Sequence, residues 1–269
     1  IGRGGADVWI DYVGLNHLGW MRGLHVNGTD VLPELLARPD LIESFEEGKL
    51  FKADWVQSLG AVPNEYLHYY YYQRDAFDAD AKAEQTRGVF LAEQQRGFYG
   101  KSDELGEREA FAAWERVRLE REATYMATNR EAAGSFERDQ TDLESGGYDK
   151  VALAIMRAIA NDEPADLILN VRNNGTLVDL DTDAVIEVPC HVDSNGPKPS
   201  QVDQLPDYAR GLVVNAKYVE RCTIEAALGG SRRDALKALA HHPLVDSVRV
   251  ADRLLEDYIA NFPQLAYLH

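Results

Sequence analysis

The sequence predicts an α+β domain. Two apolar runs typical of strands, residues 8–13 and 20–26, stand near the start of the chain. Helical patterns fill most of the middle, a hairpin signal follows at residues 167–180, and the last third is helical throughout. Strands first, helices between them and an all-helical end indicate segregated α and β elements rather than a repeated βα unit.

The first half is predicted to be mainly helical after its opening strands. Short helices are expected over residues 31–37 and 41–49, with Pro39 between them. Residues 65–74 form a tyrosine-rich helical segment, and residues 79 to about 130 are mostly charged and helical.

The second half opens with residues 134–147, which are polar and contain glycine and so predict a loop. Apolar residues at helical spacing resume at Val151. Two further helical stripes begin at Leu212 and Ala251, so the end of the chain is predicted to be helical.

The remaining strands surround a turn signal. Leu167–Val171 and Thr176–Leu180 flank Asn173-Asn174-Gly175, and Asn-Gly favours hairpin turns because it tolerates positive φ. A further strand over Ala184–Val188 is expected to end at Pro189.

Composition restricts the class of partner. The chain has 269 residues, 45% of them hydrophobic, which is enough for one large domain or two lobes with a real core. Its formal net charge of -17 argues against binding to nucleic acid or to an anionic membrane surface. A small anionic ligand remains compatible with this charge, because a few arginines set the local field in a pocket.

The cysteines and the chain start suggest an intracellular fragment. Cys190 and Cys222 provide neither a disulfide framework nor metal-ribbon spacing, which suits a reducing cytoplasm. No apolar run approaches the roughly 20 residues of a membrane span, and no secretory signal stands at the start. The chain begins at Ile1, without methionine, and enters a strand almost at once, as a piece of a longer protein would.

The polar pair Asn16-His17 is the first candidate site. It interrupts two strand-like runs, a position that often presents side chains to a cavity. The alternative interpretation is a hydrogen-bonded core histidine, which is more common for a single histidine.

Other polar and aromatic residues have ordinary structural explanations. Tyrosines at helical spacing in residues 66–72 are most often core or interface residues. Arg87 lies in the following helix, where an ion pair with Glu84 or Glu93 is the common arrangement. His241-His242-Pro243 closes a helix, which favours a capping role.

Taken in order, several blocks match one family. They are Gly14-Leu15-Asn16-His17-Leu18-Gly19-Trp20, Asn64 to Tyr70, Arg87, Asn170 to Gly175, Glu187 to Cys190, Tyr218 to Arg221, Thr223 to Ala226, and Ala238 to Leu244. With these blocks the chain resembles the C-terminal domain of glycoside hydrolase family four, and within it the 6-phospho-β-glucosidases most closely.

The chain also departs from the family pattern. Members of the family open with a Rossmann domain that holds NAD and with a Cys-Asn-x-Pro-type motif whose cysteine binds the metal, and neither occurs here. Glu65 replaces the usual proline before Tyr66, and Ser145 stands where the family often carries arginine.

The resemblance implies elimination assisted by redox chemistry rather than acid hydrolysis. NAD would remove hydride from C3 of the sugar, a tyrosinate would take the acidified C2 proton, and a divalent metal, Mn²⁺ by preference, would stabilise the resulting enediolate. It implies His17 as a metal ligand, Asn16 as a contact to sugar hydroxyls and Arg87 as the phosphate ligand. Tyr66 is the implied base, with Tyr70 as the next choice.

The resemblance also implies a domain similar to the C-terminal domain of lactate and malate dehydrogenases, with an antiparallel sheet and long helices. The expected partners are a sugar phosphate, the chain's own N-terminal Rossmann domain and further copies of itself, and the isolated chain is expected to be inactive. The alternatives are a 6-phospho-α-glucosidase, α-galactosidase or α-galacturonidase of the same family, a 2-hydroxyacid dehydrogenase, and a sugar-phosphate-binding domain without catalysis.

Overall fold

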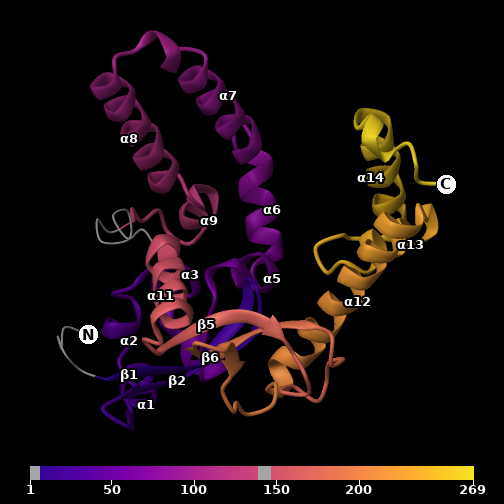
Figure 1. The fold of residues 1–269 in the computed structure, drawn as a ribbon. Coiled ribbons are helices and arrows are strands. Elements are labelled where there is room, and N and C mark those ends of the chain that lie inside the picture. The colour runs from indigo at the N-terminus through magenta and orange to yellow at the C-terminus, as the bar shows by residue number, and fades with distance from the viewer. Residues whose placement is uncertain (1–6, 139–146) are drawn as a thin grey trace.

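A computed structural model describes residues 7–138 and 147–269. One antiparallel sheet forms the base of the molecule, and two groups of helices rise from it on opposite sides (Figure 1). One group runs from α6 to α9 and the other from α12 to α14. The predicted α+β architecture, an antiparallel sheet with long helices, is confirmed.

The sheet has seven strands within the described residues, and every pairing is antiparallel. Its central order is β3-β2-β1-β6-β5, with β4 paired to β2 and β7 paired to β6. The strands are β1 (Val8–Leu15), β2 (Leu18–Val26), β3 (Thr29–Asp30), β4 (Val62–Pro63), β5 (Ala165–Arg172), β6 (Val185–Asp193) and β7 (Gly196–Pro199).

The hairpin expected between Leu167–Val171 and Thr176–Leu180 is wrong in its second strand, because β5 pairs with β6 instead, across a longer loop. Asn174 and Gly175 have positive φ, as the sequence indicated. Thr176–Leu180 is not a strand, because the fully buried Asn173 side chain organises a loop instead. Its amide donates to three backbone carbonyl oxygens at 2.9–3.0 Å and accepts the Leu177 N–H at 2.7 Å.

The predicted end of the next strand at Pro189 is wrong. β6 continues to Asp193, with Pro189 opposite Ile168 of β5. Proline has no N–H, so Pro189 can offer only its carbonyl oxygen to the adjacent backbone segment. This oxygen accepts the N–H of Ser200 at 2.8 Å.

Short helices connect the opening strands to the tyrosine-rich segment. They are α1 (Leu32–Leu36), α2 (Pro39–Ile42), α3 (Glu46–Phe51) and α4 (Ala53–Leu59). Pro39 starts α2 rather than separating two helices, since a first-turn proline lacks only an N–H that has no helical partner. The helix expected over residues 41–49 is therefore split between α2 and α3.

The tyrosine-rich segment and the charged region are helical but interrupted. The elements are η1 (Glu65–Leu67), α5 (His68–Tyr71), α6 (Gln73–Lys82), α7 (Arg87–Tyr99), η2 (Ser102–Glu104), α8 (Glu107–Ala123) and α9 (Ala127–Ala132). Tyr72, with φ -120° and ψ 40°, separates α5 from α6 where one helix was expected.

The later helices agree with the sequence pattern. They are α11 (Gly147–Asn161), α12 (Asp207–Gly229), α13 (Arg232–His241), α14 (Val248–Asn261) and η3 (Pro263–Leu265). Most of the loop expected over residues 134–147, including Ser145, lies outside the described residues. No described helix combines the length and apolar character needed to cross a membrane.

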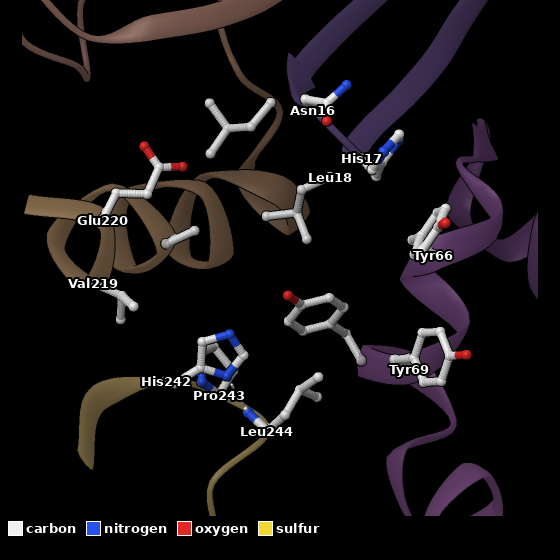
Figure 2. A pocket seen from close by; sticks show the side chains of 13 residues that line it. Asn16, His17, Leu18, Tyr66, Tyr69, Val219, Glu220, His242, Pro243 and Leu244 are labelled. Atoms are coloured by element: carbon white, nitrogen blue, oxygen red, sulfur yellow. Dashed lines mark hydrogen bonds between the residues drawn. The ribbon is translucent and has the colours of Figure 1, made fainter. Parts of the chain in front are cut away.

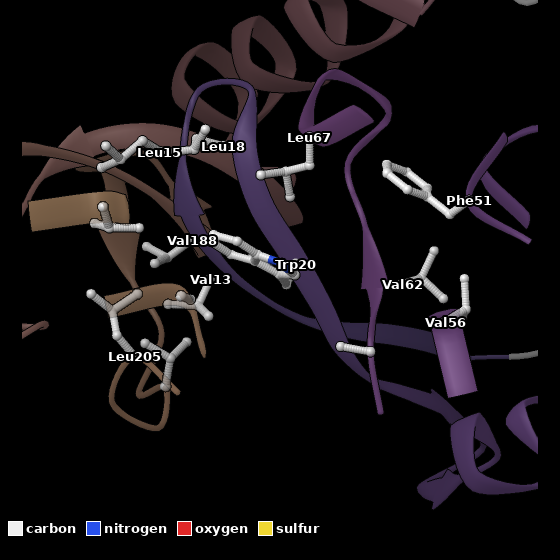
Figure 3. Packing of buried hydrophobic residues seen from close by; sticks show 14 of the residues in the cluster. Val13, Leu15, Leu18, Trp20, Phe51, Val56, Val62, Leu67, Val188 and Leu205 are labelled. Atoms are coloured by element: carbon white, nitrogen blue, oxygen red, sulfur yellow. The ribbon is translucent and has the colours of Figure 1, made fainter. Parts of the chain in front are cut away.

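The core joins the sheet to the tyrosine-rich segment (Figure 3). Trp20 of β2 is fully buried, and its indole N–H donates to the Tyr71 hydroxyl at 2.9 Å. The Tyr72 hydroxyl donates to the carbonyl oxygen of the buried Phe51 at 2.8 Å. These anchors hold α5 beside β2, so η1 lies next to the turn between β1 and β2.

That turn, Asn16-His17, depends on two glycines that pair across the strands. Gly14 has φ +155°, and a Cβ on it would lie 2.3 Å from the Leu18 carbonyl oxygen. A Cβ on its partner Gly19 would lie 2.2 Å from the hydroxyl of Tyr12. At Gly14 only glycine permits this approach, because the clashing atoms belong to the backbone, whereas at Gly19 the Tyr12 side chain would have to move.

Substitution of Gly14 is expected to disturb both stability and the turn. We expect Gly14→Ala to lower the free energy of unfolding by at least about 2 kcal/mol, since it adds a backbone clash to an unfavourable φ. Urea denaturation of the 269-residue chain measures this. Gly211→Ala is the control, because its Cβ would meet open space in α12. Equal stability of the two variants would contradict the argument.

Candidate functional site

A cavity of about 350 Å³ opens beside the Asn16-His17 turn. Four segments line it, namely this turn, the η1–α5 segment, α12 and the loop after α13 (Figure 2). These segments are far apart in the sequence, and the volume lies within the range of small-molecule sites.

His17 is half-buried and faces the cavity rather than the core. Its ring stacks on the ring of Tyr66, with centroids 4.5 Å apart and an interplanar angle of 19°. Two residues that the sequence singled out separately, and that stand 49 positions apart, are therefore in direct contact.

Glu187 of β6 accepts a hydrogen bond from the Asn16 side chain. The Asn16 amide donates to Glu187 Oε1 at 3.5 Å, and the Asn170 amide of β5 approaches the same oxygen at 3.5 Å. Burial and the neighbouring Glu187 carboxylate raise the pKa of Tyr12, which hydrogen-bonds to Glu187. Glu187 thus links three strands to the site, although the sequence suggested no role for it.

Tyr66 lies in η1, where Asn64 acts as a cap by accepting the Tyr66 N–H at 3.0 Å. The Tyr66 ring also packs edge-on against Tyr125, with centroids 6.2 Å apart. The Tyr125 hydroxyl donates to Glu65 Oε1 at 2.7 Å. Glu65, the departure from the family's proline, therefore takes part in orienting the aromatic group around Tyr66.

The tyrosine run divides between cavity and core. Tyr69 and Tyr70 line the cavity with Tyr66, and burial raises the pKa of both. Tyr71 and Tyr72 anchor the segment to the core instead. Tyr69 to Tyr72 all pack against the hydrophobic core, so the expectation that most of the run is core or interface is confirmed, and Tyr69 and Tyr70 also reach the cavity.

His68 fixes the same segment from inside. It is 1% exposed, and burial lowers its pKa to about 4, so the ring is neutral near pH 7. The amide of the buried Asn129 lies 2.9 Å from His68 Nδ1, which accepts a hydrogen bond in the matching tautomer. This buried pair joins α5 to α9 beneath the cavity-lining tyrosines.

Arg87 lies in an adjoining cavity of about 450 Å³, and Tyr69 lines both cavities. Its guanidinium donates to Thr124 Oγ1 at 2.5 Å and to the Arg121 carbonyl oxygen at 2.8 Å. Among the described contacts these replace the ion pair with Glu84 or Glu93. The structure brings Asn16, His17 and Tyr66 together and places Arg87 next to them rather than among them.

The wall opposite His17 contains two polar residues that the sequence did not assign to a site. Glu220 projects from α12, and His242 follows α13 (Figure 2). His242 does cap α13, as predicted, because its backbone N–H donates to the Leu239 carbonyl oxygen. The position of Glu220 in a family block was the only signal that could have suggested it.

The cysteines and the metal-binding groups are also informative. Cys190 and Cys222 are free and buried, and burial raises the pKa of Cys190 to about 11, in agreement with packing roles. Across residues 7–138 and 147–269, no group of three or more histidine, cysteine, aspartate or glutamate side chains could hold a metal ion. His17 is therefore at most a partial metal site within these residues.

The family 4 glycosyl hydrolase C-terminal domain matches residues 12–245, which include the whole cavity wall from Asn16 to Leu244. The chain belongs to this glycosyl hydrolase family.

Its relatives act on phosphorylated glucosides of both anomeric types. The chain is 30% identical to the 6-phospho-β-glucosidase BglT of Thermotoga maritima, over 94% of this chain and 54% of that protein. It is 26% identical to a maltose-6'-phosphate glucosidase of Fusobacterium mortiferum, over 94% and 55% respectively. The chain spans about half the length of these curated relatives.

The fold is also that of solved relatives. A structure of the Thermotoga maritima 6-phospho-β-glucosidase with manganese, NAD⁺ and glucose 6-phosphate superimposes with a TM-score of 0.69. The two are 27% identical, and the match covers 96% of this chain and 54% of that one.

Proposed function

We propose that this chain is the substrate-binding half of a 6-phospho-β-glucosidase that uses NAD and a divalent metal, with Mn²⁺ as the preferred ion. The contact between His17 and Tyr66 in one cavity carries the proposal, because it joins a metal ligand to a potential base. An N-terminal Rossmann domain of the same polypeptide would bind NAD, and the reaction would take place in the cytoplasm.

Specificity for the β anomer is supported by sequence identity. The chain is 30% identical to one 6-phospho-β-glucosidase, 26% identical to another and 27% identical to a 6-phospho-α-glucosidase, so it is the 30% match that favours the β anomer. The 6-phospho-α-glucosidases are therefore the second candidate class. A 2-hydroxyacid dehydrogenase is less well supported, because no described aspartate or arginine lines the cavity that contains His17.

The chemistry of His17 suits a divalent first-row metal, since imidazole nitrogen is among the ligands that such ions accept. The described residues do not complete a site around it. The remaining protein ligands would come from outside these residues, and we propose that the N-terminal domain supplies them.

In the proposed reaction the residues of this chain would remove one proton from the sugar and bind its hydroxyl groups. When bound, NAD and the metal supply a hydride acceptor at C3 and positive charge that favours ionisation of a phenol and stabilises the oxidised sugar. Tyr66 takes the proton from C2, which oxidation at C3 makes acidic. Asn16, oriented by Glu187, contacts the sugar hydroxyls. The electrons of the broken C2–H bond then expel the leaving group from C1, and the reaction would be completed when water adds at C1, C2 regains a proton and the hydride returns to C3.

Arg87 would bind the phosphate at the far end of the sugar. The cavity around it includes the first turn of α7, and both a guanidinium and a helix N-terminus favour anions. Asp80 lines the same cavity, so Arg87 and the helix N-terminus would supply the positive charge that a phosphate needs there.

Self-association is part of the proposal. In the described structure α7 and α8 contain no buried residues, and Tyr99 and Phe111 are exposed by 66% and 65%. Apolar side chains on a projecting helical pair are typical of an interface between subunits.

The full-length gene product should hydrolyse a chromogenic 6-phospho-β-glucoside only when both NAD and Mn²⁺ are present, and the isolated chain should not. His17→Ala should abolish the metal-dependent turnover because it removes a metal ligand. Initial rates with and without each component measure this. His25→Ala is the control, since His25 packs against Trp9 of the neighbouring strand. Unchanged activity of His17→Ala with added Mn²⁺ would rule out the assignment.

Tyr66→Phe in the full-length enzyme should lower kcat by about 10²- to 10⁴-fold, the usual contribution of a positioned base. It should also abolish solvent deuterium incorporation at C2, because the ring stays and only the proton acceptor is lost. Mass spectrometry of recovered sugar measures the exchange. Tyr70→Phe tests the second candidate; if exchange survives in Tyr66→Phe and disappears in Tyr70→Phe, Tyr70 is the base.

Arg87→Ala should raise KM for the phosphorylated substrate about ten- to a hundredfold, as expected for loss of charged hydrogen bonds. A non-phosphorylated glucoside should be affected far less, since it offers no phosphate to Arg87. Steady-state kinetics on both substrates measure this. Arg96→Ala, an exposed position on the same helix, is the matched control. Equal effects on the two substrates would show that Arg87 does not recognise phosphate.

A further inference from the structure

Three side chains form a line of hydrogen bonds that leads out of the cavity. Tyr66, the proposed base, hydrogen-bonds to Tyr125 through its side chain, and the Tyr125 hydroxyl donates to Glu65 Oε1 at 2.7 Å. Tyr66 lines the cavity, whereas Tyr125 and Glu65 lie outside its wall. The line therefore connects the base to a carboxylate that the sugar would not touch.

The direction of these hydrogen bonds follows from the number of protons available. An ionised carboxylate can only accept, so Glu65 uses the single hydroxyl proton of Tyr125. The Tyr125 oxygen can then only accept from the Tyr66 hydroxyl. Each donor thus points from the cavity towards Glu65, and a proton can pass along hydrogen bonds that share one direction.

Tyr125 is held in place by several contacts. Its ring packs edge-on against Tyr66, and the Arg138 guanidinium lies 5.1 Å from the centre of the same ring. Its carbonyl oxygen accepts a hydrogen bond from the buried Arg130. Burial, together with the hydrogen bonds to Tyr66 and Glu65, raises the pKa of Tyr125, so this residue is neutral between transfers.

Glu65 ends the line and connects it to solvent. It is half-buried, so its carboxylate can exchange a proton with water. Glu65 and Tyr66 are neighbours in η1, which Asn64 caps, and this short helix fixes the carboxylate relative to the base. Glu65 stands where the family pattern has proline, and a proline would provide no acceptor for Tyr125.

We propose that Tyr125 and Glu65 form a proton relay that acts through Tyr66 and exchanges the proton taken from C2 with solvent while the sugar fills the cavity. This inference rests on the proposed function, in which Tyr66 is the base. The relay matters because a bound sugar would cover the side of Tyr66 that faces the cavity.

Each pass through the relay moves one proton and restores all three residues. The Tyr66 phenolate takes the proton from C2 and becomes a phenol. Its proton passes to Tyr125 as Tyr125 passes its own to Glu65, and the Glu65 carboxylic acid then loses one proton to water. The reverse sequence brings a solvent proton to Tyr66, which delivers it to C2 when the reaction is completed.

The test measures deuterium at C2 of the product after the full-length enzyme, with NAD and Mn²⁺, has hydrolysed a 6-phospho-β-glucoside in deuterium oxide. Glu65→Gln keeps an acceptor for the Tyr125 hydroxyl but takes up no proton, and Tyr125→Phe keeps the ring without the hydroxyl. Glu34→Gln in α1 and Tyr258→Phe in α14, both at exposed positions, are the matched controls.

We expect the wild-type enzyme and the controls to place solvent deuterium at C2. Glu65→Gln and Tyr125→Phe should lower the deuterium content at least about fivefold, the effect on an exchange rate of losing one hydrogen-bonded step. Their kcat should fall less than about tenfold, because Tyr66 remains and can return the original proton to C2. Mass spectrometry and initial rates measure the two quantities separately.

A merely structural role would lower kcat and leave the deuterium content of the product at the wild-type level, and this result would overturn the inference. Wild-type turnover without deuterium at C2 would also overturn the relay, while the glycosidase activity would stand. A wild-type enzyme that hydrolyses no 6-phospho-β-glucoside would overturn the proposed function and the relay together.

Discussion

The close approach of β1 and β2 at Gly14 and Gly19 is the constraint on which the site depends. It permits a two-residue turn between the strands, so Asn16 and His17 project from the end of the β1–β2 hairpin instead of packing within the sheet. Because the Tyr12 hydroxyl occupies the space beside Gly19, the same approach also brings Tyr12 to Glu187, the residue that holds Asn16. The packing of these two strands therefore also determines the geometry of the site.

The tyrosine-rich segment performs two tasks with neighbouring residues. Tyr71 and Tyr72 hydrogen-bond into the core, while Tyr66, Tyr69 and Tyr70 line the cavity. The break at Tyr72 lets α6 leave the sheet after α5 has been anchored, and the buried His68–Asn129 pair holds the anchor against α9. A rigid support of this kind keeps aromatic side chains in place at a site that contains few hydrogen bonds of its own.

Much of the fold was predictable because local sequence patterns determine many of its helices and strands. The opening strands, the helical character of residues 147–161 and the all-helical end follow from apolar spacing. The loop after Asn173 was not predictable, since a fully buried amide satisfied by three carbonyl oxygens is a product of tertiary packing. The expected end of the strand at Pro189 was wrong for a similar reason. A strand tolerates proline where the adjacent backbone segment needs only a hydrogen-bond acceptor, as Ser200 does here.

The sequence by itself determined the family and the residue types of the candidate site, because motifs such as the one around Asn16-His17 keep their order along the chain. Only the tertiary structure decided which of these residues meet. It stacked His17 on Tyr66, placed Arg87 in an adjoining cavity, and added Glu220 from α12 and His242 from the loop after α13. Contact between distant segments depends on how helices pack against the sheet, and no local pattern encodes that distance.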